Sequence, residues 1–136
     1  MHKLFVYGTL RNRYESLGQH EIEGVLLDLS WFPGIILGIF GPKGAPLTVK
    51  ADLIKVSDEE LKRLDAYEGY YPDDEKRSLF IRKNCIATDG RCAQIYEYNP
   101  ALSKEAAIRE HGIIESGDWF DRSSKTLLRE DATVSF

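Results

Sequence analysis

A glutamate near the middle of the chain, Glu68, stands where a carboxyl group could act as a general acid or base. It lies at the expected C-terminal end of a helix, beside Gly69, where the helix macrodipole disfavours a carboxylate by up to about 1 kcal/mol. Its neighbours over 66–71 are uncharged, and three of them are tyrosines. If Glu68 is buried, both features raise the pKa of its carboxyl group, as proton transfer near neutral pH requires. The competing interpretation is a surface glutamate in a tyrosine-rich loop.

The second candidate is the segment made of Tyr7, Gly8, Thr9 and Leu10, which follows an apolar run rich in strand formers. Where a strand ends in Gly and Thr, successive backbone N–H groups can form a concave anion-binding site. Such donors hold a carboxylate or an oxyanion that develops during a reaction. A plain turn at the end of a strand is the alternative interpretation.

Other catalytic machinery is not visible in the sequence. The three histidines, at positions 2, 20 and 111, lack the spacing of metal ligands, and no serine lies in a G-x-S-x-G motif. Neither a G-x-G-x-x-G sequence nor a phosphate-binding P-loop occurs. We therefore expect no metal and no cofactor.

Periodicity and turn residues predict the elements that position these candidates. Alternating apolar and polar residues predict a strand over 48–56, and Ser57 with Glu60 forms a capping box that begins a helix ending before Gly69. Further predictions are strands over 3–7, 23–29, 34–40, 79–87 and 91–98, a turn over 41–44, and helices over 14–20 and 103–111. Strands outnumber the isolated helices, so we expect an α+β fold: one small domain built on a curled mixed β-sheet or barrel with a few short helices.

Two cysteines flank Asp89-Gly90, a pair that predicts a two-residue hairpin turn. With that turn Cys85 pairs with Gln94, so Cys85 and Cys92 become diagonal neighbours on one face. Diagonal Cα atoms lie about 7–8 Å apart, which exceeds the usual range of a disulfide. We expect two reduced thiols in a reducing compartment.

Composition limits the class of protein. The chain of 136 residues is 43% hydrophobic and 29% charged, which is typical of one globular domain. A formal net charge of −4 without a cluster of Lys or Arg argues against a nucleic-acid partner. The N-terminus lacks the pattern of a signal peptide, and the longest apolar stretch, 31–40, is about half the length of a membrane span. We expect a cytoplasmic protein without membrane association.

Taken together, several segments resemble the γ-glutamylcyclotransferase-like family, of the γ-glutamylamine cyclotransferase type. In chain order they are FVYGTLR (5–11), GVLLDL (24–29), FPG (32–34), LDAYEGY (64–70), FIR (80–82), AQIYEY (93–98) and SGDW (116–119). Each block is weak alone, but their order and spacing are specific. The chain departs from the family at Ala51-Asp52, where Gly-Glu is usual, and at Phe80, where Tyr is usual. The resemblance implies a γ-glutamylcyclotransferase-like domain over 1–120 and a C-terminal tail of unknown structure over 121–136.

The resemblance also implies a reaction. In this family the substrate's own α-amine attacks its γ-carbonyl, so that 5-oxoproline and a free amine leave, and the protein supplies no nucleophile. Glu68 matches the catalytic acid/base, and residues 7–10 match the substrate-binding loop. Tyr96 resembles a pocket tyrosine whose hydroxyl could bind the substrate, or it packs on the sheet. Arg82 could steer the α-carboxylate of the substrate, although a strand arginine is more often a solvated edge residue.

Other hypotheses stay open. A non-catalytic module could bind a γ-glutamyl group or another small anion, although Glu68 favours the enzyme because anion binding gains nothing from a nearby carboxylate. The tail, with Leu127, Leu128 and residues 134–136, could serve assembly with another chain, whereas a frayed terminus is the default. The leaving amine could be an amino acid, the ε-amine of lysine or the amine of a larger metabolite. No oligomeric state is predicted.

Overall fold

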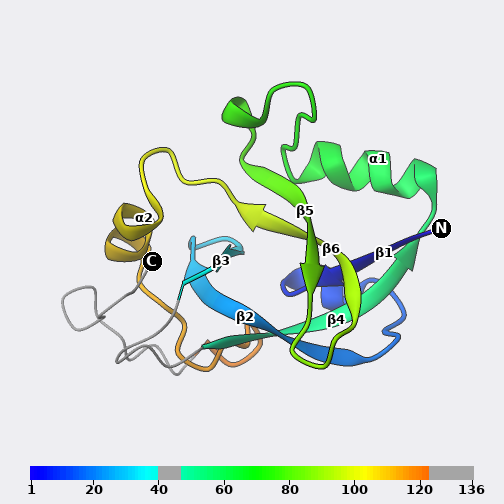
Figure 1. Cartoon of the computed structure of the whole chain (residues 1–136), viewed down its shortest axis with the longest axis horizontal. Helices are drawn as coiled ribbons and strands as arrows, with labels where there is room; N and C mark the ends of the chain where they lie inside the picture. The colour runs from blue at the N-terminus through cyan, green and yellow to red at the C-terminus, as the bar shows by residue number, and fades with distance from the viewer. Residues whose placement is uncertain (40–46, 123–136) are drawn as a thin grey trace.

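The computed structural model describes residues 1–39 and 47–122 (Figure 1). The strands are β1 (His2–Val6), β2 (Gln19–Asp28), β3 (Pro33–Leu37), β4 (Thr48–Val56), β5 (Phe80–Ile86) and β6 (Cys92–Tyr98). The helices are α1 (Asp58–Tyr67), α2 (Lys104–His111) and the 3₁₀ helices η1 (Thr9–Asn12) and η3 (Glu75–Arg77). The predicted turn over 41–44 and the tail from residue 123 onward lie outside the described residues. None of the described helices has the length and apolar character needed to cross a membrane.

Five strands close into a barrel. Antiparallel pairing joins β1 to β4, β4 to β2 and β2 to β3. Strand β6 then pairs in parallel with both β3 and β1, which closes the ring, and β5 is an extra antiparallel strand on β6. The predicted class, a small α+β domain on a mixed barrel with few helices, is confirmed.

The strands bury both of their faces. Successive side chains of a strand point to opposite sides, so Phe5 of β1 belongs to a different cluster from Leu4 and Val6. The cluster that contains Phe5 draws buried residues from all five barrel strands and therefore fills the barrel interior; it includes Phe5, Ile22, Leu26, Ile35, Val49, Ala51, Leu53 and Ile95.

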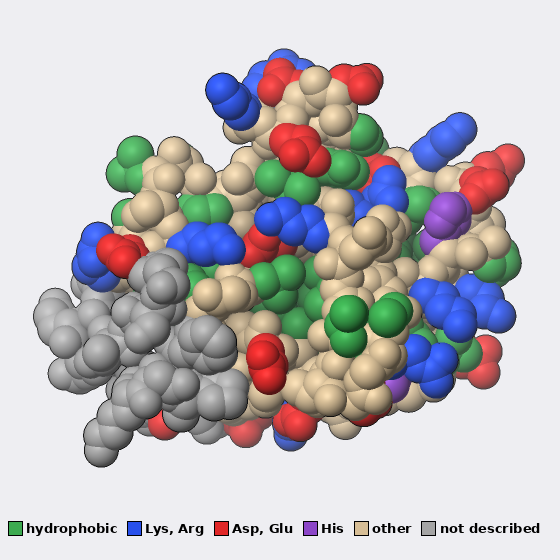
Figure 2. Space-filling model, in the orientation of Figure 1, with side chains coloured by type: hydrophobic (Ala, Val, Ile, Leu, Met, Phe, Trp, Pro, Cys, Tyr) green, Lys and Arg blue, Asp and Glu red, His purple; other side chains and the backbone are tan. Residues whose placement is uncertain are grey.

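The two α-helices cover the outside of the barrel. Helix α1 packs Leu61 and Leu64 on the outward side chains of β1 and β4, and each such leucine contributes about 1.5–3 kcal/mol by leaving water. Helix α2 packs Ala107 and Ile108 on β2 and β3. On the face shown in Figure 2, Lys and Arg side chains are interspersed with Asp and Glu side chains.

Helix α1 begins and ends where its sequence predicts. The Ser57 hydroxyl accepts a hydrogen bond from the Glu60 N–H at 3.2 Å. At the other end Gly69 adopts φ +65°, and the N–H groups of Gly69 and Tyr70 donate to carbonyls of the last turn at 3.1 and 2.8 Å. These two bonds form a Schellman motif, which glycine favours because it adopts positive φ without strain. The motif places Glu68 at the C-cap of the helix.

The predicted helix over 14–20 is wrong. The 3₁₀ helix η1 ends at Asn12, before this segment, and no helix is found over 14–20. Strand β2 begins at Gln19, four residues before the strand predicted at 23–29. Pairing with β4 decides the outcome, since the Leu17 N–H donates to the Leu53 carbonyl at 2.7 Å and the Leu53 N–H donates to the Gly18 carbonyl at 2.9 Å. These long-range bonds override a weak local helix preference.

The predicted two-residue hairpin turn is also wrong. The Ala87 N–H donates to the Arg91 carbonyl at 2.8 Å, so the connection between β5 and β6 is a three-residue loop over 88–90. Gly90 adopts φ +90°, as expected when a type I turn is followed by a left-handed residue.

The extra loop residue changes the register of the hairpin. Cys85 lies opposite Ala93 rather than Gln94, and Cys92 lies opposite Ile86. A slip of one residue moves a side chain to the other face, so the two cysteines lie on opposite faces instead of sharing one. Both are free thiols, as predicted, although the geometric reason given for it was wrong; the reducing compartment stays a prediction.

Candidate active site

A cavity of about 220 Å³ opens between the end of β1, the C-terminal end of α1 and the start of β5. It is lined by all six residues predicted for the site, Tyr7, Gly8, Thr9, Leu10, Glu68 and Tyr96, together with Phe5, Val6, Phe32, Pro33, Tyr67, Leu79 and Phe80. The fold therefore brings together candidates that are up to 89 positions apart in the sequence. Glu68 is the only charged side chain among these lining residues.

Glu68 reaches the cavity from the last turn of α1. Burial raises the pKa of its carboxyl group from the ordinary 4.5 to about 7. Two tyrosines, Tyr7 and Tyr96, line the same cavity. Burial raises the pKa of Tyr7 and of Tyr96, and the negative charge of Glu68 adds to both shifts. A carboxyl group with a pKa near 7 can accept and donate a proton at neutral pH.

The loop of residues 7–10 supplies backbone donors on the same cavity. Among the described residues, no hydrogen bond uses the N–H of Gly8, Thr9 or Leu10. The Gly8 carbonyl accepts from the Arg11 N–H at 3.1 Å, which begins η1 and holds the loop in shape. Three uncommitted N–H groups in succession are suited to bind an anionic oxygen.

The hydroxyl group of Tyr7 is already bonded to the protein and stabilises the wall of the cavity. Its hydroxyl donates to the Tyr96 carbonyl at 2.5 Å and accepts from the Ile35 N–H at 3.2 Å. The phenol therefore joins the end of β1 to β6 and β3. The side chain lines the cavity with its ring, and the residue is 7% exposed.

Tyr96 is held by a polar network that sequence reasoning missed. Its hydroxyl donates to Asp65 Oδ1 at 2.6 Å, and Arg82 binds the same carboxylate through two nitrogens at 2.9 and 3.1 Å. A third Arg82 nitrogen donates to Gln94 at 2.7 Å. Arg82 is absent from the cavity lining. Asp65 lies one helical turn before Glu68 in the segment LDAYEGY (64–70). This spacing places both carboxyl groups on one side of the helix, and it is the feature of the sequence that could have identified Asp65.

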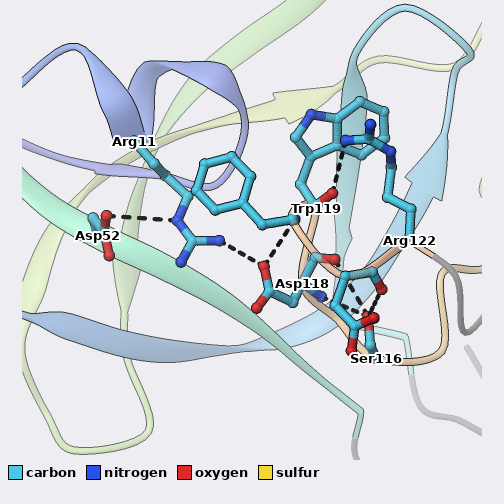
Figure 3. Close-up of polar contacts among 8 residues, drawn as sticks. Arg11, Asp52, Ser116, Asp118, Trp119 and Arg122 are labelled. Atoms are coloured by element: carbon cyan, nitrogen blue, oxygen red, sulfur yellow. Dashed lines mark hydrogen bonds and ion pairs between the residues drawn. The ribbon is translucent and has the colours of Figure 1, made fainter.

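A second network holds Arg11, the residue that directly follows the loop of residues 7–10 (Figure 3). Arg11 Nη1 donates to Asp118 Oδ1 at 2.8 Å, and Arg11 Nε lies 3.5 Å from Asp52 Oδ2. The guanidinium also lies over the Phe120 ring, 4.4 Å from its centroid. The Arg11 side chain is only 8% exposed, so this contact is shielded from solvent. The loop is thereby connected to β4 and to the turn over 116–119.

Gly8 stands where there is little space for a side chain. Its φ of −116° is accessible to any residue, so the backbone conformation does not call for glycine. A Cβ at this position would lie 3.0 and 3.1 Å from the Cγ and Cδ atoms of Pro33, which also lines the cavity.

We therefore predict that Gly8→Val fills part of the cavity and raises KM by about tenfold or more, because a misplacement of about 1 Å is costly in a positioned site. Gly8→Ala, with a smaller intrusion, should show an intermediate KM. Steady-state kinetics and thermal unfolding of both variants separate a binding defect from misfolding. A Gly8→Val protein with the KM of the wild type would remove this loop from the substrate site.

A family model described as "Gamma-glutamyl cyclotransferase, AIG2-like" matches residues 4–121. The chain belongs to this family, which confirms the resemblance of the sequence motifs.

Two relatives are similar over much of their length. A Vibrio cholerae protein named "Putative gamma-glutamylcyclotransferase" is 30% identical over 132 residues, which cover 89% of this chain and 97% of that protein. A Niallia circulans protein named "Gamma-L-glutamyl-butirosin B gamma-glutamyl cyclotransferase" is 33% identical over 113 residues, which cover 73% of this chain and 68% of that protein.

Solved structures share the fold. The solution structure of Escherichia coli protein ytfP has a TM-score of 0.59 and 24% identity, covering 89% of this chain and 98% of that one. The crystal structure of c4763, a uropathogenic E. coli-specific protein, has a TM-score of 0.63 and 13% identity, covering 92% and 97%. At these identities the likeness concerns the fold alone.

Proposed function

We propose that this γ-glutamyl cyclotransferase cleaves a γ-glutamyl amide and releases 5-oxoproline and a free amine. The observation that carries the proposal is the shared cavity of Glu68 and the backbone donors of Gly8, Thr9 and Leu10. Family membership supports the cyclotransferase class. The name of the Niallia circulans relative, which contains a γ-L-glutamyl conjugate, supports a γ-glutamyl amide as the substrate class.

The proposed reaction uses the substrate as its own nucleophile. An anionic oxygen of the glutamyl group binds the N–H groups of the loop 7–10, and the α-ammonium faces Glu68. Glu68 accepts a proton from the ammonium, and the freed amine forms a bond to the carbon of the γ-carbonyl group. The bond from the carbonyl carbon to the amide nitrogen breaks as Glu68 returns the proton to that nitrogen. Glu68 then accepts the second proton of the attacking nitrogen, which becomes the ring N–H of 5-oxoproline, and this proton leaves with the released amine as its ammonium form. No water molecule is consumed.

Two physical contributions support this assignment. Holding the amine and the carbonyl in contact can lower the barrier by about 7–11 kcal/mol in well-oriented intramolecular reactions. Proton transfer by a positioned side chain contributes about 10²–10⁴-fold. Because Glu68 has a pKa near 7, one carboxyl group can serve as base and then as acid.

The alternative, a binding module for a small anion, is less well supported. A carboxylate in the cavity would repel an anionic ligand, and desolvating Glu68 would bring no benefit to binding alone. We also place the protein in the cytoplasm, a proposal supported by the two free cysteines, Cys85 and Cys92.

A panel of γ-glutamyl amides tests the proposal. The wild-type protein is incubated with each amide, and 5-oxoproline and the released amine are quantified together. We expect equimolar products from at least one amide. Tight binding of several amides without release of either product would favour the binding module instead.

The pH dependence of kcat/KM should follow Glu68. The carboxyl group must be ionised to accept the proton of the α-ammonium, and its pKa is about 7. We therefore expect kcat/KM to fall by about tenfold for each pH unit below 7 and to level off above it. A profile that is flat between pH 5 and 8 would contradict this role.

Activity should not depend on a metal ion. The proposed steps need none, and the described residues contain no group of three or more His, Cys, Asp or Glu side chains placed to hold one. We predict equal kcat/KM before and after exhaustive chelation, measured with the same amide. Loss of activity that one divalent ion restores would show that the mechanism is wrong.

A further inference from the structure

We infer that Asp65 is a positioning residue: it binds the proton of the Tyr96 hydroxyl, so that the Tyr96 oxygen acts as a hydrogen-bond acceptor for the α-ammonium of the substrate. The inference rests on the proposed function and deepens it, because it assigns Tyr96 to the amine of the substrate and not to the oxyanion that develops at the carbonyl group. Three features carry it: the direction of the bond from Tyr96 to Asp65, the fixed orientation of Asp65, and the position of both residues relative to Glu68.

The single proton of the Tyr96 hydroxyl is already bonded to the protein. The hydroxyl donates to Asp65 Oδ1 at 2.6 Å. A carboxylate can only accept, so the direction of this hydrogen bond is fixed. Burial and the bond to Asp65 both raise the pKa of Tyr96, so the phenol keeps its proton. Because Tyr96 also lines the cavity, its oxygen offers lone pairs to a ligand there and no proton.

Asp65 is itself held in one orientation by Arg82. Arg82 Nε donates to Asp65 Oδ1 at 2.9 Å, and Arg82 Nη2 donates to Asp65 Oδ2 at 3.1 Å. A contact through two parallel bonds fixes the plane of a carboxylate as well as its distance. Arg82 is held in turn by Gln94, which accepts from Nη1 at 2.7 Å. The carboxylate therefore keeps one oxygen in place for the Tyr96 proton.

The Tyr96 oxygen lies near the end of α1 at which Glu68 enters the cavity. Asp65 and Glu68 are three positions apart on this helix, so their side chains are neighbours on one face. The negative charge of Glu68 contributes to the raised pKa of Tyr96. The described lining residues include no cation, so this part of the cavity offers two acceptors, the Glu68 carboxylate and the Tyr96 oxygen. An ammonium group, which has several N–H donors and no lone pair, matches such a pair.

This contact orients the amine for its attack. After Glu68 has accepted one proton from the α-ammonium, the amine keeps two protons and gains a lone pair. A hydrogen bond from one of these protons to the Tyr96 oxygen limits rotation of the amine, so the lone pair can be held towards the carbonyl carbon. Tyr96 takes up no proton, and Asp65 acts only through Tyr96.

Calorimetry with a matched pair of ligands tests the assignment of Tyr96. Glutaryl-methylamide differs from γ-glutamyl-methylamide only by lacking the α-amine. Both are titrated into the Glu68→Gln protein, in which turnover is suppressed, with and without Tyr96→Phe. We expect Tyr96→Phe to weaken binding of γ-glutamyl-methylamide by about tenfold or more, and that of glutaryl-methylamide by less than about threefold. Equal losses for the two ligands would overturn the inference, because the hydroxyl would then contact a group that both ligands share.

A double-mutant cycle tests the positioning role of Asp65 in the same background. Asp65→Leu removes the acceptor and should weaken binding of γ-glutamyl-methylamide by about fivefold, with no further effect once Tyr96→Phe is present. Asp65→Asn keeps an acceptor oxygen and should retain most of the affinity. Losses that add, or an equal loss for glutaryl-methylamide, would show that Asp65 does not act through Tyr96. If Asp65→Leu does not fold by circular dichroism, the combined Asp65→Leu and Arg82→Leu protein, which leaves no unpaired charge, replaces it in the cycle.

Tyr98→Phe is the matched control. Tyr98 lies two residues beyond Tyr96 on β6 and is absent from the described cavity lining, so its variant should keep both affinities. A loss that is specific to the amine-bearing ligand in Tyr96→Phe, without turnover of any γ-glutamyl amide by the wild-type protein, would support the inference and contradict the reaction. Turnover by the wild-type protein together with equal losses for the two ligands would support the reaction and overturn the inference.

Discussion

Glu68→Gln is expected to lower kcat/KM for a γ-glutamyl amide by about 10²-fold or more. Glutamine keeps the shape of the side chain but neither accepts the proton of the α-ammonium nor returns one to the leaving nitrogen. Substrate should still bind, because the donors of the loop 7–10 are unchanged. Steady-state kinetics and calorimetry measure the two effects. If kcat/KM of Glu68→Gln lies within a few fold of the wild-type value, Glu68 is not the general acid/base.

Glu59→Gln is a suitable control for this substitution. Glu59 is exposed in the first turn of the same helix and is remote from the cavity lining. The change of charge and shape is the same, so we expect activity close to that of the wild type. A large loss in Glu59→Gln would indicate that net charge, rather than the group at position 68, controls the rate.

The Glu68→Gln variant should also differ from the wild type in its free energy of unfolding, by an amount that depends on pH. The folded state holds the Glu68 proton up to about pH 7, whereas the ordinary value of 4.5 applies to the unfolded chain. Between these values the folded state binds more protons, so stability falls as pH rises. Removing the carboxylate should therefore stabilise the fold at pH 8 by up to about 3 kcal/mol, with little effect near pH 4.5. Urea unfolding at the two pH values measures this difference.

Gly117→Ala is expected to destabilise the protein by about 3 kcal/mol or more, the largest effect on folding that we predict. Gly117 adopts φ +67°, and a Cβ there would lie 2.0 Å from the backbone oxygen of Thr48. Relief of that clash requires movement of the main chain. The Lys50 N–H donates to the Gly117 carbonyl at 2.7 Å, so the movement would disturb the attachment of the turn to β4.

Gly90→Ala separates the clash from the cost of positive φ. Gly90 adopts φ +90°, but a Cβ there meets nothing within 4 Å. Its substitution should cost only about 1–2 kcal/mol, the usual penalty of a left-handed backbone. Similar losses of unfolding free energy in the two variants would contradict the steric account of Gly117.

The turn at Gly117 also supports the loop of residues 7–10 in the candidate active site. It presents Asp118 to Arg11, which directly follows the loop 7–10 and contacts Asp118 at 2.8 Å (Figure 3). Any Gly117→Ala protein that remains folded should therefore show a raised KM as well, because the loop loses part of its support.

Local signals in the sequence predicted the elements that depend on local chemistry. Ser57 and Gly69 predicted the limits of α1, because capping bonds join residues close in the chain. The alternation over 48–56 predicted β4 to the residue. The position of Glu68 at the helix end followed from these signals, and the family motifs placed the loop 7–10 beside it.

Features that depend on distant contacts were missed or wrong. The helix expected over 14–20 was displaced by pairing of this segment with β4. The hairpin register was wrong by one residue, because Asp89-Gly90 is compatible with both a two-residue and a three-residue loop. The contacts of Asp65 with Tyr96 and of Arg11 with Asp118 join segments 31 and 107 positions apart, and no local pattern specifies them.

The central claim is that the substrate's own amine, and no water molecule, attacks the γ-carbonyl. The most direct test is turnover of a γ-glutamyl amide by the wild-type protein in water enriched in ¹⁸O, with the products analysed by mass spectrometry. Cyclisation predicts 5-oxoproline in equimolar amount with the free amine and without ¹⁸O, because no oxygen from the solvent enters the product. Glutamate that carries one ¹⁸O atom would show hydrolysis and would contradict the account.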